Sequence, residues 1–221
     1  MTNPEFSIEF DILYNNISSN KAPGLNEYEK SVFLTKSQEQ IVTELYSGRN
    51  NTYNSFEETE EQRRYLSNLV YTESLYKVDG STDNLYDTSY CYELPSDMLF
   101  ITAEIVKLDN NKIASVYPVS QDELTKIIKN PFRGPSKNRV LRLDLNSNLV
   151  ELVTDTNTNI KDYKIRYIKK PNPIILESLP EGDSLTINNK SSESKCELDS
   201  SLHRTILDRA VALALQTMYS K

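Results

Sequence analysis

His203 is the side chain of this sequence best suited to general acid and base chemistry near neutral pH, and it is the only histidine. A catalytic triad that contains His203 would need a serine or cysteine nucleophile within a known sequence motif, yet no GxSxG motif occurs in the chain. Metal motifs that use two histidines are excluded because there is no second one. We interpret His203 as a partly exposed structural residue in the first turn of the last predicted helix.

Clustered carboxylates are the second candidate for chemistry. Four of them fall close together, at Glu57, Glu58, Glu60 and Glu61. Acid and base catalysis needs two carboxyl groups in different environments. These four crowd one predicted helix start, where negative charge is favourable. Residues 79–83 offer too few regularly spaced oxygens for a calcium loop, and none of the five glycines belongs to a phosphate-binding loop. The sequence therefore predicts no catalytic residue, no metal and no cofactor, and an enzyme such as a hydrolase would have to depend on His203.

The strongest local charge anomaly is a basic segment in an otherwise acidic chain. The net charge of the whole chain is −7, but no Asp or Glu interrupts this segment. Its cations are Lys126, Lys129, Arg133, Lys137, Arg139 and Arg142. Such a lobe could contact an acidic partner or line a passage for DNA. An ordinary solvated loop and strand face is the other interpretation, and the sequence leaves both open.

Length and composition bound the class of protein. With 221 residues, of which 38% are hydrophobic, the chain can form one large core or two smaller ones. Glu9 and Asp11 interrupt the apolar start, so no secretory signal is expected. The longest apolar run, 210–215, is far shorter than the roughly 20 residues that span a bilayer. Cys91 and Cys196 are predicted to be free thiols of a soluble intracellular product.

Capping residues and a 3.6-residue apolar period predict four main helices. They run from Asn3 to about Ser18, from Asn26 to Gly48, from Ser55 to about Asn68, and from about Ser200 to Tyr219. Asn3 is the predicted N-cap of the first, with Pro4 following it. Its predicted apolar stripe is Phe6, Phe10, Leu13 and Ile17. The last helix has a wide apolar arc, which indicates burial on more than one side.

Between the third and last helices the apolar period changes to alternation, which predicts strands. These are residues 69–78, 90–94, 98–108, 112–119, 139–145, 149–154, 163–170 and 184–188. The clearest hairpin joins 139–145 to 149–154; in it Leu141 and Leu143 are predicted to face a core, and Arg142 and Asp144 to face water. A short helix at 120–129 interrupts the strands.

The predicted architecture is therefore α+β. Residues 1–68 form the first part of a discontinuous helical bundle, which the helix at 198–221 completes. Residues 69–197 form a β-rich insertion that ends in a polar linker at 190–197.

Three stretches of the sequence carry a family resemblance. In the first, the matching residues are Phe6, Phe10, Tyr14, Asn15, the corner Ala22, Pro23, Gly24 and Leu25, and then Tyr28, Glu29, Lys30, Ser31, Leu34, Thr35 and Gln38. The other two stretches are 167–176 and 202–211. Together they resemble the head-to-tail connector, or adaptor, ring proteins of short-tailed, crAss-like bacteriophages. Residues 70–160 carry no match.

The resemblance implies a structural protein of the virion neck or tail, made in the bacterial host cytoplasm and not bound to a membrane. It implies a portal-associated ring of identical subunits, a dodecamer of twelve copies, which connects the portal to other neck or tail proteins and extends the DNA ejection channel. Genomic DNA would pass through such a ring. The alternative hypothesis is a nucleic-acid-binding module that acts in the infected cell through the basic lobe at 126–142.

Overall fold

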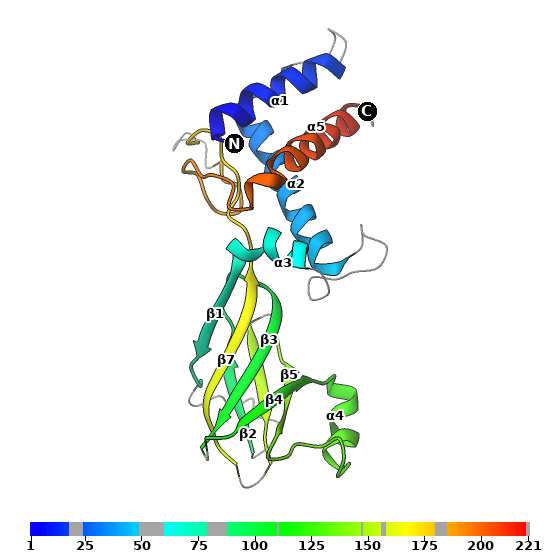
Figure 1. The fold of residues 1–221 in the computed structure, drawn as a ribbon, viewed down its shortest axis with the longest axis vertical. Helices are drawn as coiled ribbons and strands as arrows, with labels where there is room; N and C mark the ends of the chain where they lie inside the picture. Colours follow the sequence, from blue (N-terminus) through cyan, green and yellow to red (C-terminus); the bar gives the residue numbers. More distant parts are fainter. Residues whose placement is uncertain are drawn as a thin grey trace. The chain divides into compact units, whose positions relative to one another are not determined.

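The computed structural model describes residues 1–17, 24–48, 60–78, 88–109, 111–146, 148–155, 158–179 and 185–219. The chain divides into two compact units (Figure 1). The helical unit is Met1–Leu69 with Lys170–Lys221, and the β unit is Val70–Lys169. Within the described residues the protein has five α-helices and one seven-stranded sheet, so the predicted α+β class is confirmed. Residues 170–197, which the sequence grouped with the insertion, lie in the helical unit.

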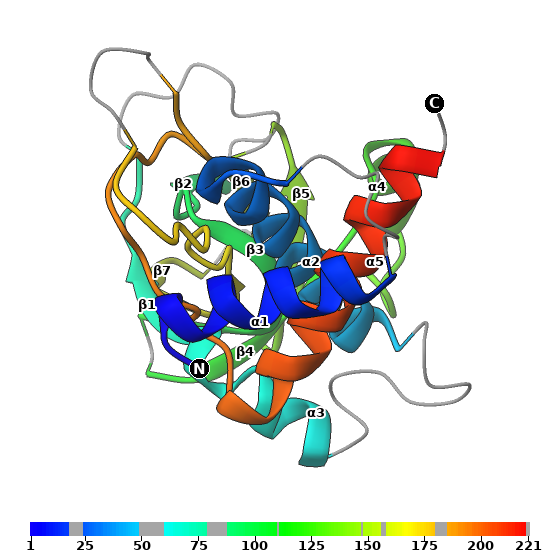
Figure 2. The ribbon, with the colours of Figure 1, turned by 90° about the horizontal axis from the view of Figure 1, so that it is seen from above.

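Three long helices make up most of the helical unit. The described elements are α1 (Asn3–Ile17), α2 (Glu27–Ser47), the short α3 (Glu60–Tyr65), the 3-10 turns η1 (Ser67–Leu69) and η2 (Ser200–Leu202), and α5 (His203–Tyr219). Both α1 and α2 pack against α5, and Figure 2 shows α1 beside α5. On α1 the fully buried side chains are Phe6, Phe10 and Tyr14, spaced four residues apart, so the core stripe passes through Tyr14 instead of the half-buried Leu13.

Capping fixes the helix ends, although one cap differs from the prediction. Asn26 caps α2 in a reciprocal capping box with Glu29, and Gly48 ends the helix at φ 69°, both as predicted. At α1 the predicted cap, Asn3, is itself helical. Thr2 makes the box instead, since its N–H donates to Glu5 Oε2 at 2.7 Å and its hydroxyl accepts from Glu5 N.

The described residues of the segment after β7, 170–179 and 185–197, include side chains that pack on α2, which explains why this segment belongs to the helical unit. Ile175, Leu179 and Ile187 form a buried cluster against Tyr28 and Val32 of α2. Two backbone hydrogen bonds join Ile175 to Ser194 and hold the two arms of this segment together. The described part of the predicted strand 184–188 forms only an isolated bridge, Ile187 with Lys190.

The β unit is a curled sheet in the strand order β1-β7-β3-β4-β5-β6-β2. Its strands are β1 (Val70–Leu75), β2 (Ser89–Glu93), β3 (Met98–Leu108), β4 (Ile113–Pro118), β5 (Arg139–Asp144), β6 (Leu149–Val153) and β7 (Ile160–Lys169). All neighbours are antiparallel except β4 and β5, which are joined by a crossover through α4 (Gln121–Ile128). Val78 N donates to Cys91 O of β2, so the segment after β1 meets the other edge strand.

Strand β5 is covered on both faces, which corrects one prediction. Leu141 and Leu143 pack against Leu124 and Ile127 of α4. The opposite face points to the inside of the curled sheet, where Val140 joins the main core. The predicted hairpin of β5 and β6 is confirmed, but Arg142 was wrongly placed in water: its side chain is 12% exposed. The reason is that the sheet curls over this face, whereas alternation assumes one solvated side.

Candidate contact surfaces

Three polar side chains of α2 hold an extended segment along the helix. Ser31, Thr35 and Gln38 lie four and three residues apart, so they share one face of the helix. Ser31 Oγ accepts from Leu176 N at 3.0 Å, and Thr35 Oγ1 both accepts from Ile174 N at 3.0 Å and donates to Ile174 O at 3.3 Å. Gln38 Nε2 donates to the carbonyl of residue 172 at 2.7 Å. We call this set the α2 ladder; it gives buried backbone groups the partners that a neighbouring strand would otherwise supply.

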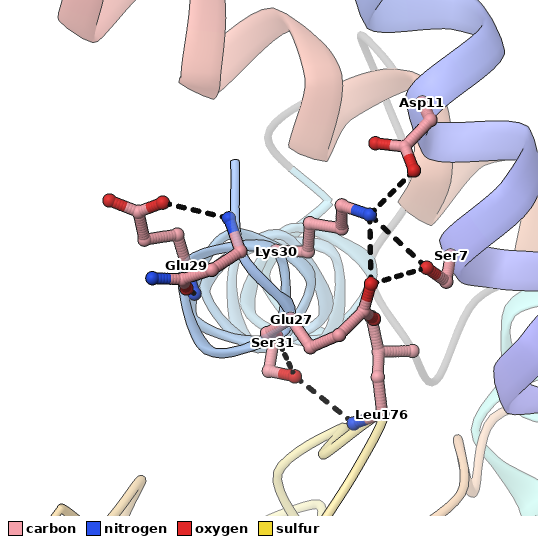
Figure 3. A network of polar contacts seen from close by, with 8 residues as sticks. Ser7, Asp11, Glu27, Glu29, Lys30, Ser31 and Leu176 are labelled. Atoms are coloured by element: carbon pink, nitrogen blue, oxygen red, sulfur yellow. Dashed lines mark hydrogen bonds and ion pairs between the residues drawn. The ribbon is translucent and has the colours of Figure 1, made fainter. Parts of the chain in front are cut away.

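A buried lysine fastens α1 to α2 beside this ladder (Figure 3). Lys30 is 3% exposed, and its ammonium lies 2.7 Å from Asp11 Oδ2 on α1 and 2.9 Å from Glu27 Oε1. It also donates to Ser7 Oγ at 3.2 Å. Burial alone would lower the pKa of Lys30, but the hydrogen bonds and charges of Asp11 and Glu27 outweigh it and raise the pKa. Lys30 therefore stays charged, and its ion pair with Asp11 joins α2 to α1.

The third matching stretch lies against the same helix. Ser37 donates to Ile206 O of α5 at 2.8 Å, and Arg209 of α5 forms an ion pair with Glu44 at 2.6 Å. Within the helical unit, the segments that carry the resemblance thus meet around α2 and serve packing. In the family corner, Ala22 and Pro23 lie outside the described residues; Gly24 has open space around it.

His203 is occupied by structural contacts. Its Nδ1 lies 2.5 Å from the amino group of Met1 and its Nε2 lies 3.2 Å from Leu198 O. It is 7% exposed, so it is more deeply buried than predicted. Burial, followed by the nearby amino terminus, lowers the pKa of His203. Cys91 and Cys196 do not form a disulfide bond. Among the described residues, no group of three or more His, Cys, Asp or Glu side chains is placed to hold a metal ion.

The six predicted contact cations fall into two groups in the β unit. Lys126, Lys129 and Arg133 are exposed on α4 and the turn that follows it, and Lys137 is exposed in the next turn, before β5. Arg139 lies over the Tyr117 ring at 5.0 Å and donates to the carbonyl of residue 132 at 2.6 Å. Arg142 is held inside the sheet, 2.6 Å from Glu104 and 3.0 Å from Asp144. The structure therefore places three of the six, Lys126, Lys129 and Arg133, on α4 and the turn after it, and uses Arg139 and Arg142 in intramolecular contacts.

The turn after α4 displays an aromatic side chain that the sequence reasoning did not single out. Phe132 is 87% exposed. Asn130 Oδ1 accepts hydrogen bonds from the backbone N–H of Phe132 at 2.9 Å and of Arg133 at 3.3 Å. Gly134 closes the turn, because a Cβ there would lie 2.8 Å from Asn130 O. The sequence feature that could have indicated this exposed side chain is an apolar residue in a turn between Pro131 and Gly134. We call Lys126, Lys129, Phe132 and Arg133 the Phe132 lobe.

A cavity adjoins this lobe. It has a volume of about 480 Å³ and lies between β4, α4 and the turn. Arg133, Arg139 and Glu123 supply its charged lining, and Tyr117, Ile127 and Leu141 contribute apolar surface. Pro118, Val119 and Ser120 complete the lining.

The outward side of α1 also exposes apolar side chains. Ile8 and Ile12 are 61% and 53% exposed, and they lie one helical turn apart. Glu5 is exposed beside them and Glu9 is half-buried. Residues 1–17 contain no Lys or Arg. We call Glu5, Ile8, Glu9 and Ile12 the α1 face.

Buried tyrosines predict how the β unit responds to alkali. Burial raises the pKa of Tyr92 and of Tyr163, with Glu104 adding to the effect at Tyr163, and burial with Asp97 and Glu73 raises the pKa of Tyr167 to about 12. An unfolded tyrosine titrates near pH 10. Because the folded pKa values are higher, the stabilisation is complete below about pH 10 and is lost as pH rises towards about 12 and beyond.

We therefore expect the free energy of unfolding to fall between about pH 10 and about pH 12. The measurement is urea unfolding at a series of pH values, with phenolate absorbance recorded in parallel. Tyr167→Phe should make the decline shallower. Ionisation of every tyrosine near pH 10 in a protein that stays folded would contradict this account.

No helix within the described ranges is both long and apolar enough to cross a bilayer. The model of the family described as "Phage tail ring protein 3/4" matches residues 1–221. The chain is similar to "Ring protein 3" of Bacteroides phage crAss001, with 50% identity over 224 residues that cover 97% of this chain and 95% of that protein. It is also similar to "Ring protein 4/5" of the same phage, with 39% identity over 216 residues that cover 95% and 90% of the two chains. The match spans both units, including residues 70–160, and the chain thus belongs to the phage tail ring protein 3/4 family.

Proposed function

We propose that this protein is a structural subunit of a ring in the neck of a crAss-like phage, where it connects the portal to the tail and extends the channel through which DNA leaves the capsid. The observation that carries the proposal is the family match over the whole chain, together with 50% identity to a protein named Ring protein 3. We further propose twelve copies around the portal axis, with other neck or tail proteins as neighbours. Synthesis in the host cytoplasm and incorporation into the virion follow from this role.

The subunit acts through shape and contacts, without turnover. Two arrangements support this. The polar contacts of Lys30 join α1 to α2, and the α2 ladder joins α2 to the segment around Ile174; both make the helical unit rigid. The helical and β units each expose apolar and charged surface, on the α1 face and the Phe132 lobe. We propose that the helices form the discontinuous bundle and that the β unit is its insertion, so that each offers a separate contact surface.

A second candidate function is nucleic-acid binding in the infected cell. The specific observation in its favour is the exposed set Lys126, Lys129, Arg133 and Lys137, because lysine and arginine dominate binding to phosphates. The net charge of −7 opposes general coating of DNA and confines any such contact to this lobe. DNA that passes through the ring would meet the same cations if the lobe faced the channel.

Electron microscopy of intact virions tests the first function. We expect density for this chain as a closed ring of twelve copies around the portal axis, between the portal and the tail. Absence of the chain from mature particles, or a location away from that axis, would overturn the proposal. Binding of isolated subunits to duplex DNA with an affinity that falls steeply with salt would favour the second function.

A further inference from the structure

We propose that the Phe132 lobe of one subunit docks on the α1 face of the next copy of this chain. The inference rests on the proposed ring function and names the residues that join neighbouring copies. The lobe offers a positively charged surface around an exposed aromatic ring. The α1 face offers a negatively charged surface around two exposed isoleucines.

The lobe is already organised for binding. The Asn130 side chain and the Gly134 backbone fix the turn, and Arg139 holds the carbonyl of Phe132 at 2.6 Å. Phe132 nevertheless remains 87% exposed, so in the described part of the chain the turn holds an apolar ring in water. A fixed aromatic side chain is a favourable anchor for an interface, because little conformational entropy is lost when it docks.

The α1 face complements the lobe in both chemistry and charge. Ile8 and Ile12 present an apolar strip on which an aromatic ring can be buried. Asp11 is neutralised by Lys30 at 2.7 Å, whereas Glu5 and Glu9 make no ion pair with a lysine or arginine in the described structure. Lys129 and Arg133 on the lobe would supply the opposite charge.

A second copy is the partner that fits both surfaces at once. The two surfaces belong to different elements of one chain, so their contact is heterologous, and such contacts generate a closed ring when the rotation from one subunit to the next closes on itself. DNA would pair with the cations of the lobe but would leave the acidic, apolar α1 face without a partner.

Cysteine bridging tests the contact in assembled particles. Virions are produced in host cells that supply two full-length variants, one with Lys129→Cys and one with Glu9→Cys, in place of the wild-type chain. A short bismaleimide should then link the two variants into a dimer of twice the 25.4 kDa chain mass. Virions that contain either variant alone serve as the control for Cys91 and Cys196, and should give no such dimer.

Charge reversal gives an independent test. Lys129→Glu with Arg133→Glu, and separately Glu5→Lys with Glu9→Lys, should each lower the number of incorporated copies by about tenfold, since like charges would then face each other. The combination of all four changes should restore incorporation to within about threefold of wild type. The matched control, Lys107→Glu with Lys161→Glu, makes the same charge change elsewhere on the β unit and should leave incorporation unchanged.

The outcomes separate this inference from the proposed function. The inference would be overturned, and the ring function left intact, if this chain forms a closed ring but the bismaleimide links no dimer and the combined charge reversal restores no incorporation. A bridge from Lys129→Cys to a protein of different mass, or loss of DNA binding with normal incorporation, would also overturn it. Absence of any ring of this chain from the neck would refute the proposed function itself.

Discussion

Replacement of Arg142 by methionine is expected to lower the free energy of unfolding of the β unit by about 3–5 kcal/mol. Arg142 is 12% exposed, and its NH1 atom lies 2.6 Å from Glu104 Oε2, which is 9% exposed. Burial alone would lower the pKa of Arg142, but Glu104 and Asp144 outweigh it and raise the pKa, so the guanidinium stays charged. Methionine would fill much of the space but leave the Glu104 carboxylate without its positive partner inside the sheet.

Urea unfolding followed by tyrosine fluorescence measures this effect, because the chain has 14 tyrosines and no tryptophan. The double variant Arg142→Met with Glu104→Gln should recover most of the loss, since glutamine carries no charge and still accepts the hydrogen bond from Tyr163. Arg166→Met, on an exposed position of β7, is the matched control and should change stability by less than about 0.5 kcal/mol. An Arg142→Met protein as stable as wild type would show that the pair is not needed for folding.

The second large effect is expected from Thr35→Val in the α2 ladder. This change keeps the shape of the side chain but removes the hydroxyl that serves both the N–H and the C=O of Ile174. Thr35 is 4% exposed and Ile174 is fully buried, so water cannot easily replace the hydroxyl. With about 1–3 kcal/mol for each of the two buried groups left unsatisfied, we expect a loss of roughly 2–6 kcal/mol from the helical unit.

Thr35→Ser tests whether the hydroxyl carries the effect, because it keeps both hydrogen bonds and should cost much less than valine. Thr43→Val, on an exposed position of the same helix, controls for the helix propensity of valine. Stability should be followed by circular dichroism in urea. Equal losses for Thr35→Ser and Thr35→Val would show that packing, not the ladder, explains the result.

Both networks bear on assembly because ring subunits must present their contact surfaces in a fixed geometry. The α2 ladder and Lys30 both belong to α2, and Lys30 joins α2 to α1, which carries the α1 face. Arg142 of the Glu104–Arg142 pair belongs to β5, the strand that packs against α4. A subunit weakened at either network is therefore expected to lose incorporation into virions together with stability. The lobe variant Lys129→Glu with Arg133→Glu should lose incorporation alone.

Local sequence signals determined most of the secondary structure. The alternation at residues 139–145 and 149–154 predicted the β5 and β6 hairpin, and the polar start at Ser120 predicted α4. Asn26, Glu29 and Gly48 predicted the ends of α2 because caps depend on neighbouring residues only. The basic segment was visible as an uninterrupted run of cations, and the family resemblance was visible in segments that later proved to pack around α2.

Tertiary structure alone decided which distant groups meet. No spacing within the sequence could show that Thr35 binds Ile174, because the two residues are separated by 139 positions. Alternation placed Arg142 in water, but the curl of the sheet turned that face inward and gave it Glu104 as a partner. The exposure of Phe132 likewise depends on where the turn after α4 ends. Periodicity in the sequence indicates which face of a helix or strand is apolar. The segment that packs against this face depends on the path of the whole chain.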